Sequence, residues 1–182
     1  MKKINIILAV DDKNGLWKDW DLAWTISSEL KYFKNITSTT KDLAKLNAVV
    51  MWKKTWESIP QKYRPLPNRI NCVLSRSIKD ESINSKINDY VLYFNSIESC
   101  IWELLKKTNL ENIFIIWWAN IYNQILNHER LNKIYLTKIS WDFTCDVFFN
   151  WIPNNFELES ESEDKEENWI KFKFQVFKKV NN

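Results

Sequence analysis

The sequence predicts an α/β protein that forms a single domain over residues 1–182. Three observations predict this class. Short apolar runs, typical of strands buried on both faces, alternate with amphipathic segments of helical period. This alternation predicts a central, mostly parallel, twisted sheet with helices on both of its faces. Two segments near the end of the chain, 156–161 and 170–177, alternate strictly between polar and apolar residues and predict an antiparallel C-terminal hairpin.

Each element follows from a local pattern, and together they give about eight strands and about four helices. The expected strands are 4–10, 48–51, 70–74, 91–94, the run that begins at Asn112, 133–139, 156–161 and 170–177. The expected helices are 25–36, with Ser27 or Thr25 as its cap, 53–58, 97–107 and one that begins near Ile121. We interpret 11–21 and 60–68 as loops and 161–167 as a solvated acidic turn without a function.

Composition excludes several classes of protein. The net charge of +3 is too small to predict a nucleic-acid or membrane partner. The three cysteines form no Cys-x-x-Cys pair and are expected to be reduced thiols. The apolar run after Lys3 is too short for a signal peptide, and no segment approaches the roughly 20 apolar residues of a membrane span. We therefore expect a cytoplasmic protein.

The single histidine, His128, has a polar setting and no cluster of partner residues, so we interpret it as a surface residue. No spacing of His, Cys and Asp predicts a metal site. Basic residues instead follow predicted strands: Lys53-Lys54-Thr55 after the second and Ser75-Arg76 after the third. Ligands of open α/β sheets bind at the carboxyl ends of strands, which favours a polyanion site here. The alternative is that these are solvated loop charges.

Glu29 is the acid of the apolar-faced helix that contains Leu30 and Phe33. One interpretation is a first-turn carboxylate that the helix dipole stabilises. The other is a partly desolvated acid that faces a cleft, with a raised pKa suited to proton transfer. The pattern alone leaves both open.

Four ordered segments resemble the dihydrofolate reductase family over essentially the whole chain. They are Leu8-Ala9-Val10 through Trp24, the stretch Val49-Val50-Met51-Trp52-Lys53-Lys54-Thr55-Trp56, the stretch from Arg64-Pro65-Leu66 to Ser75-Arg76, and Ile116-Trp117-Trp118-Ala119-Asn120-Ile121-Tyr122. The resemblance implies a monomer that transfers a hydride from NADPH to C6 of 7,8-dihydrofolate, with protonation at N5, to give tetrahydrofolate for one-carbon metabolism.

The resemblance also implies a role for each matching residue. Glu29 would be the catalytic acid, assisted by a water near Trp24, and Arg69 would bind the glutamate carboxylate. The carbonyls of Ile7 and Ile116 would accept from the pterin amino group, and Thr137 would support Glu29. The remaining substrate contacts would be Leu8, Ala9, Leu30, Phe33, Ile59, Leu66 and Tyr122. The NADPH contacts would be Ala9, Leu16, Asp21, Lys53, Lys54, Thr55, Ser75, Arg76, Trp117, Trp118, Ala119, Asn120, Ile121 and Tyr122.

The departures from the family are of one kind. The chain has a single glycine, Gly15, where average composition of about 7% predicts roughly 13, and it has 11 tryptophans. Five tryptophans occupy glycine positions of the family motifs, and three more lie in turn contexts: Trp17, Trp20, Trp52, Trp117 and Trp118, then Trp141, Trp151 and Trp169. Our hypothesis is that the gene reads UGA as glycine and that the written sequence reads it as tryptophan. Trp102, inside a predicted helix, does not fit this pattern.

Three other functions remain at this point. If the tryptophans are genuine, the protein would be a catalytically impaired member of the fold, and indoles at Trp117 and Trp118 would distort or block the cofactor site. A related pteridine or pyrimidine reductase is the alternative within the enzyme class, although Arg69 favours folate. An aromatic platform for single-stranded nucleic acid is weakened by the small net charge.

Overall fold

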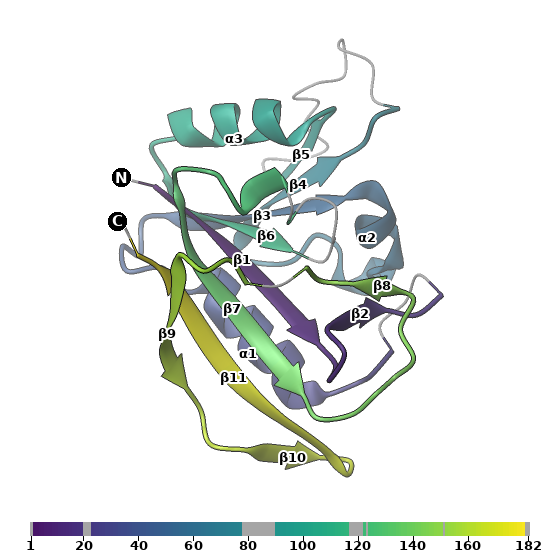
Figure 1. Ribbon diagram of the computed structural model, residues 1–182. Coiled ribbons are helices and arrows are strands. Elements are labelled where there is room, and N and C mark those ends of the chain that lie inside the picture. Colours follow the sequence, from purple (N-terminus) through teal and green to yellow (C-terminus); the bar gives the residue numbers. More distant parts are fainter. Residues whose placement is uncertain are drawn as a thin grey trace. The chain divides into compact units, whose positions relative to one another are not determined.

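The computed structural model describes residues 2–19, 23–77, 90–116, 122, 124–150 and 152–180 (Figure 1). Within these residues eleven strands, three α-helices and one short 3-10 helix follow one another along the chain. The chain divides into two compact units: Met1–Ile4 with Asn35–Trp118, and Asn5–Lys34 with Ala119–Asn182. No helix among the described residues is long and apolar enough to cross a membrane.

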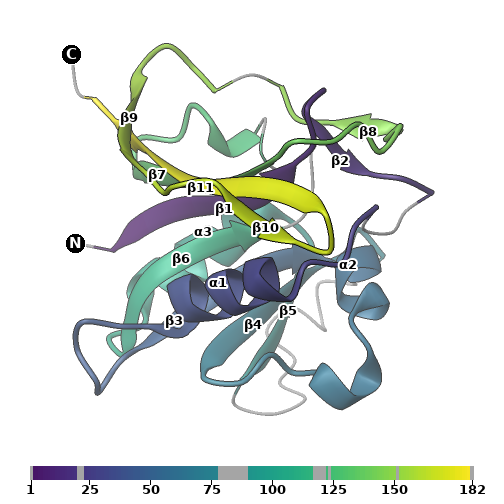
Figure 2. The same ribbon diagram turned by 90° about the horizontal axis from the view of Figure 1, so that it is seen from below.

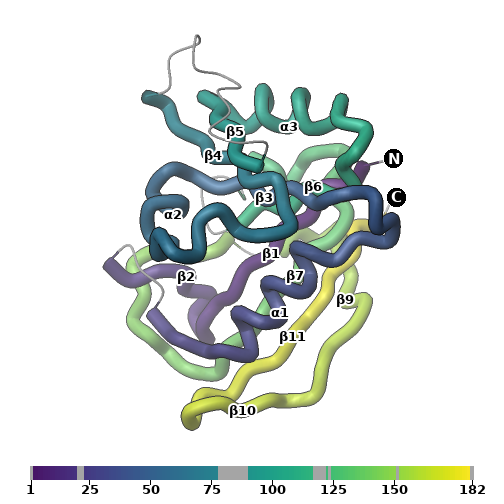
Figure 3. Tube along the Cα trace, turned by 180° about the vertical axis from the view of Figure 1, so that it is seen from behind, coloured from purple at the N-terminus to yellow at the C-terminus, as the bar shows by residue number. Residues whose placement is uncertain are grey.

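The first unit contains a parallel sheet whose strands are almost completely buried. They are β3 (Leu46–Trp52), β4 (Arg69–Leu74), β5 (Val91–Phe94) and β6 (Leu110–Ile116), in the order β6-β3-β4-β5. The step from β3 to β4 and the step from β5 to β6 run in opposite directions across the sheet. Right-handed crossovers therefore place α2 (Lys53–Ser58) and α3 (Ile97–Lys106) on opposite faces (Figure 3).

Helix α3 shows how sequence sets these elements. Ser96 caps it by accepting a hydrogen bond from the backbone N–H of Ser99 at 3.2 Å. Its buried residues, Ile97, Cys100, Ile101 and Leu104, repeat at helical spacing and form one apolar face toward the strands. Between α2 and β4, the 3-10 helix Gln61–Tyr63 interrupts the predicted loop, and the Arg64–Pro65 peptide is cis, as its sequence permits.

The second unit is mainly antiparallel. Strand β11 (Ile170–Lys179) pairs with β7 (Leu131–Ile139) on one side and with β9 (Phe156–Glu161) and β10 (Lys165–Glu167) on the other (Figure 2). Helix α1 (Ser27–Ser38) begins in this unit, and Tyr32 of the helix stacks on Phe174 of β11 with ring centroids 4.0 Å apart. A separate two-stranded sheet joins β2 (Gly15–Trp17) to β8 (Val147–Phe148).

Strand β1 (Lys3–Val10) contributes residues to both units and is buried from its second residue onward. Hydrogen-bonded pairing orders the main sheet as β10-β11-β7-β1-β6-β3-β4-β5, with β9 beside β11. The predicted α/β class, with a mostly parallel sheet and antiparallel C-terminal strands, is confirmed.

Three details differ from the sequence predictions. Helix α1 begins at Ser27 instead of Thr25, because Trp24 and Ile26 turn into the core ahead of it. The predicted acidic turn contains β10, and the predicted loop 11–21 contains β2. The described residues hold three α-helices, and the expected fourth, near Ile121, lies partly outside them.

Candidate active site

Glu29 is the one buried carboxylate of α1, and it lies in the first turn of that helix. Only 5% of the residue is exposed to solvent. Burial raises the pKa of Glu29 to about 7, with no opposing contribution from a hydrogen bond or a cation in the described part of the chain. A carboxyl group with this pKa is partly protonated at neutral pH and can both release and recover a proton. This favours the functional interpretation of Glu29 over that of a dipole-stabilised surface acid.

Thr137 of β7 faces the same helix. Its direct cross-strand partner is Phe174, and partners in an antiparallel pair project from the same face of the sheet. Phe174 contacts Tyr32, so this face is the one that α1 covers. Thr137 is fully buried there. The topology therefore places its hydroxyl beneath the helix that carries Glu29.

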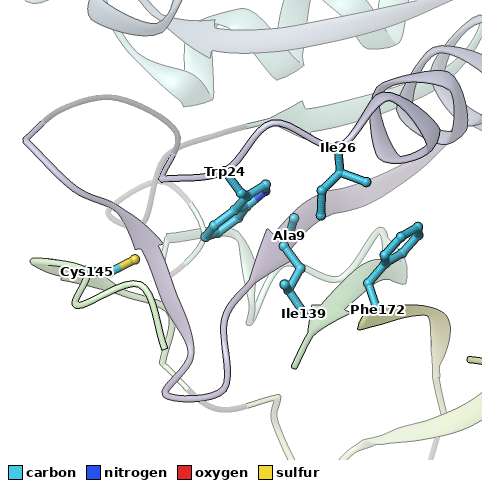
Figure 4. Packing of buried hydrophobic residues seen from close by; sticks show 6 residues of the cluster. All are labelled: Ala9, Trp24, Ile26, Ile139, Cys145 and Phe172. Carbon is cyan, nitrogen blue, oxygen red and sulfur yellow. The ribbon is translucent and has the colours of Figure 1, made fainter. Parts of the chain in front are cut away.

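Trp24 belongs to a buried cluster with Ala9, Ile26 and Phe172, which Cys145 and Ile139 complete (Figure 4). In Figure 4, Trp24 and Ile26 extend from the segment that precedes α1 toward Ala9 on β1. The indole nitrogen of Trp24 is buried and has no hydrogen-bond partner among the described residues. A buried donor without a partner is costly, so this nitrogen is suited to a water or ligand acceptor.

The predicted contacts on β1 are buried, and one of them is already hydrogen-bonded. The hydroxyl of Tyr122 donates to the carbonyl oxygen of Ile7 at 3.3 Å. Ile7, Leu8 and Ala9 are all buried, as is Leu16 of β2. On α1, Phe33 is buried, whereas 43% of Leu30 is exposed. Leu30 is thus the predicted wall residue of this helix that is most accessible to a ligand.

In the first unit, Arg69 is a buried cation. Its Nη1 donates to the hydroxyl of Thr37 at 2.7 Å, and its Nε donates to the carbonyl of Pro67 at 3.0 Å. Burial lowers the pKa of Arg69 to about 10, so the guanidinium stays charged at neutral pH. These bonds fix the side chain in one orientation, which suits recognition of a carboxylate.

The loop before Arg69 is anchored by Asn71 of β4. The side chain of Asn71 accepts from the N–H of Leu66 and donates to its carbonyl, both at 3.0 Å. Leu66 is half-buried, while Ile59 and Ile116 are buried. The predicted apolar contacts of this unit therefore lie on ordered backbone.

The predicted cofactor residues collect at one edge of the parallel sheet. Trp52 and Leu74 are the last paired residues of β3 and β4, so Lys53 and Ser75 follow at neighbouring strand ends. Lys53, Lys54 and Arg76 are exposed, and Thr55 and Ser75 are buried. Three cations beside two hydroxyls are suited to bind phosphate groups. Six predicted cofactor residues lie outside the described residues: Asp21, Trp117, Trp118, Ala119, Asn120 and Ile121.

Two acids that sequence reasoning passed over organise the second unit. Asp11 is fully buried, and its carboxylate accepts from the N–H groups of Lys13, Gly15 and Phe143. Gly15 is required here, because a Cβ at this position would lie 2.4 Å from Cβ of Cys145. The second acid, Glu167, lies in the segment that we had interpreted as a turn without a function. For Asp11 the only sequence signal was its place directly after a buried strand.

The glycine hypothesis has one direct structural observation in its favour. Asn168 and Trp169 form the two-residue connection between β10 and β11, with φ values of 52° and 66°. Positive φ at both positions is typical of an Asn-Gly hairpin turn, and the indole of Trp169 is 90% exposed. Trp17, Trp52 and Trp141 have negative φ, and Trp20, Trp117, Trp118 and Trp151 lie outside the described residues. The expected distortion at Trp117 and Trp118 therefore has no outcome here.

Comparison with known proteins gives a consistent result. The family model described as "Dihydrofolate reductase" matches residues 3–179. The chain is 37% identical to a dihydrofolate reductase of Drosophila melanogaster, over 98% of this chain and 99% of the relative. It is 34% identical to one of Heliothis virescens, over 98% of each, and 40% identical to one of Saccharomyces cerevisiae, over 72% of this chain and 64% of the relative.

Proposed function

Because the chain belongs to the dihydrofolate reductase family, we propose specific roles for its residues in the reduction of 7,8-dihydrofolate by NADPH. The enzyme is an NADPH-dependent oxidoreductase that produces 5,6,7,8-tetrahydrofolate. NADPH, when bound, supplies the hydride that reaches C6 of the substrate. The residues of the protein bind and align the two molecules, exclude water and deliver the proton to N5.

Glu29 is the proposed source of that proton, and its burial carries the proposal. A pKa of about 7 keeps part of the enzyme in the protonated form at neutral pH, whereas an exposed glutamate would be almost fully ionised. The unpartnered nitrogen of Trp24 supplies a donor that can hold a water between the acid and N5. Thr137, which faces α1, is proposed to hold the carboxyl of Glu29 against the amino edge of the pterin.

The other proposed substrate contacts follow the character of each group. Carbonyls of Ile7 and Ile116 accept from the pterin amino group, and Arg69 binds the glutamate carboxylate. The apolar residues form the walls around the rings: Leu8, Ala9, Leu30, Phe33, Ile59, Leu66 and Tyr122. A charged partner for the tail separates this reading from a reductase of a smaller pteridine or pyrimidine, for which Arg69 would have no ligand group.

The basic edge of the first unit fits NADPH. We propose that Lys53, Lys54, Thr55 and Ser75 bind its phosphates and that Arg76 binds the 2′-phosphate that distinguishes NADPH from NADH. The guanidinium of Arg76 lies 6.0 Å from the ring centroid of Trp52, near the start of α2. Its charge is thus held beside the strand ends and not dispersed along the surface.

We further propose that the protein is a monomeric, single-domain enzyme of the cytoplasm. The three cysteines are free and buried, which agrees with a reducing compartment. Sedimentation should give one species of the chain mass, and thermal unfolding should give one cooperative transition.

We also propose that the working enzyme has glycine at the eight positions named above. The turn at Trp169 supports this, because an L side chain rarely adopts its backbone conformation. The experiment compares two expressed forms, one with tryptophan and one with glycine at all eight positions, by following NADPH oxidation in the presence of dihydrofolate. We expect turnover in the glycine form and little in the tryptophan form. Equal activity would reject the steric argument, and UGG codons at these positions in the gene would reject the recoding.

A further inference from the structure

Glu167 and Glu29 are two carboxylates that lie close to the same helix end but differ in environment. Glu167, at the end of β10, accepts from the backbone N–H of Ser27 at 2.6 Å and from that of Ser28 at 2.9 Å. It also accepts from the Ser28 hydroxyl at 2.6 Å. These hydrogen bonds lower the pKa of Glu167 to about 2, so it remains ionised at all ordinary pH values.

The first N–H groups of a helix lack partners within the helix and attract carboxylates. Glu29 directly follows Ser27 and Ser28, so in an uncapped helix it would itself be the nearest anion for these donors. Glu167 occupies two of them with both of its oxygens. Its negative charge also offsets the positive end of the helix dipole, which would otherwise favour the ionised form of Glu29.

The hairpin that carries Glu167 is well placed for this contact. Glu167 pairs with Ile170, and Ile170, Phe172 and Phe174 project from one face of β11. Phe174 stacks on Tyr32, and Phe172 packs with Trp24 and Ile26. The same face of the hairpin therefore contacts α1 and the segment before it through apolar side chains, and caps the helix through Glu167.

We propose that Glu167 is a positioning residue for the known reaction: by capping α1 from another strand, it leaves the carboxyl of Glu29 free to face the substrate in its protonated form. The inference rests on the proposed role of Glu29. Sequence reasoning missed it because residues 161–167 contain no apolar pattern and lie about 140 residues from Ser27.

Other titratable groups near Glu29 do not replace this effect. Tyr32 of α1 interacts with the charge of Glu29, and Tyr135 of β7 interacts with Tyr32, but the pKa of Tyr32 is about 12. Lys165 shares the face of Glu167, because its partner is Phe172, but it is exposed. Glu166 pairs with Lys171 and projects from the opposite face, which makes it a matched control.

The test measures the rate of dihydrofolate reduction from about pH 5 to about pH 9 for Glu167→Gln, Glu166→Gln, Glu29→Gln and the parent enzyme. Loss of the Glu167 charge should lower the apparent pKa of the profile. A shift of one pH unit reduces the protonated fraction of Glu29 about tenfold well above its pKa and leaves it nearly unchanged well below. We expect Glu167→Gln to match the parent near pH 5 and to lose roughly three- to tenfold at pH 8, with Glu166→Gln unchanged.

Two further variants keep the proposal testable if Glu167→Gln folds poorly. Glu167→Asp retains the charge and should restore most of the parent profile, and Ser28→Ala removes one of the three bonds and should shift it less. A uniform loss of rate at every pH, or profiles that coincide for Glu167→Gln and Glu166→Gln, would overturn the positioning role. If Glu29→Gln kept the parent profile, the proposed role of Glu29 itself would fail. A flat Glu29→Gln profile beside an unshifted Glu167→Gln profile would reject the positioning role alone.

Discussion

Nη1 of Arg69 donates a 2.7 Å hydrogen bond to the hydroxyl of Thr37, and both residues are buried. The bond joins the start of β4 to the last turn of α1 within the first unit. A buried guanidinium needs such acceptors, since an unpaired buried donor carries a large desolvation cost. The contact therefore orients Arg69 before any substrate binds.

We predict that Thr37→Val, which removes the acceptor and keeps the shape, raises KM for dihydrofolate. Loss of a hydrogen bond to a charged group corresponds to roughly 1.5–3 kcal/mol, or at least about tenfold in affinity. The chemical step should change little, because Arg69 does not contact the reacting atoms in this account. Steady-state kinetics check this, with Thr39→Val as the exposed control. An unchanged KM, or a loss confined to kcat, would contradict the positioning of Arg69.

The stability of the enzyme should depend on pH through Glu29. Its pKa rises from 4.5 to about 7 on folding, so the folded state binds more protons between these pH values. The stabilisation is fully present below about pH 4.5 and is lost as the pH rises through about 7. The loss is on the order of 3 kcal/mol in unfolding free energy. Urea unfolding of the parent and of Glu29→Gln should show this slope only in the parent, and equal slopes would contradict it.

The two most informative tryptophans for the glycine hypothesis are Trp169 and Trp102. Trp169 has φ of 66°, and an L residue in this region costs about 1–2 kcal/mol, so Trp169→Gly should stabilise the protein by roughly 0.5–1 kcal/mol. Trp102 lies within α3 and contacts Lys106, so Trp102→Gly should destabilise it by a similar amount. Thermal melts of the two variants decide this. Changes of the same sign would remove the structural support for glycine at position 169.

Arg76→Gln should weaken NADPH more than NADH. The charged bond to the 2′-phosphate is worth about 1.5–3 kcal/mol, so KM for NADPH should rise about tenfold or more while that for NADH stays nearly constant. Lys62→Gln, in the 3-10 helix of the same unit, is the control for a general loss of positive charge. A parallel loss for both cofactors would assign Arg76 to another part of the molecule.

The sequence predicts the buried strands well because their apolar runs report burial on both faces. Helix α2 begins and ends where its pattern indicated, and α3 differs by one residue. The start of α1 was wrong because its cap comes from Glu167, which is 139 residues from Ser28 and carries no local signal. Strand β10 was missed for a related reason, since Lys165-Glu166-Glu167 lacks the alternation that marks a half-buried strand.

The candidate site shows the same division between local and distant information. Glu29 could be singled out from the sequence, but its raised pKa depends on burial that only the fold supplies. The anchoring of Arg69 by Thr37, 32 residues away, and the buried Asp11 network had no counterpart in the pattern. Residues that position the site thus depended on the structure, whereas residues that match the family motifs did not.

The most direct test of the account is the pH dependence of hydride transfer from NADPH to dihydrofolate, measured by stopped flow in the glycine form of the enzyme and in its Glu29→Gln variant. If Glu29 delivers the proton, the parent rate falls as the pH rises through about 7. The variant should be slower by at least about a hundredfold near neutral pH and should lack this transition. A variant that kept the parent rate and the parent transition would contradict the central claim.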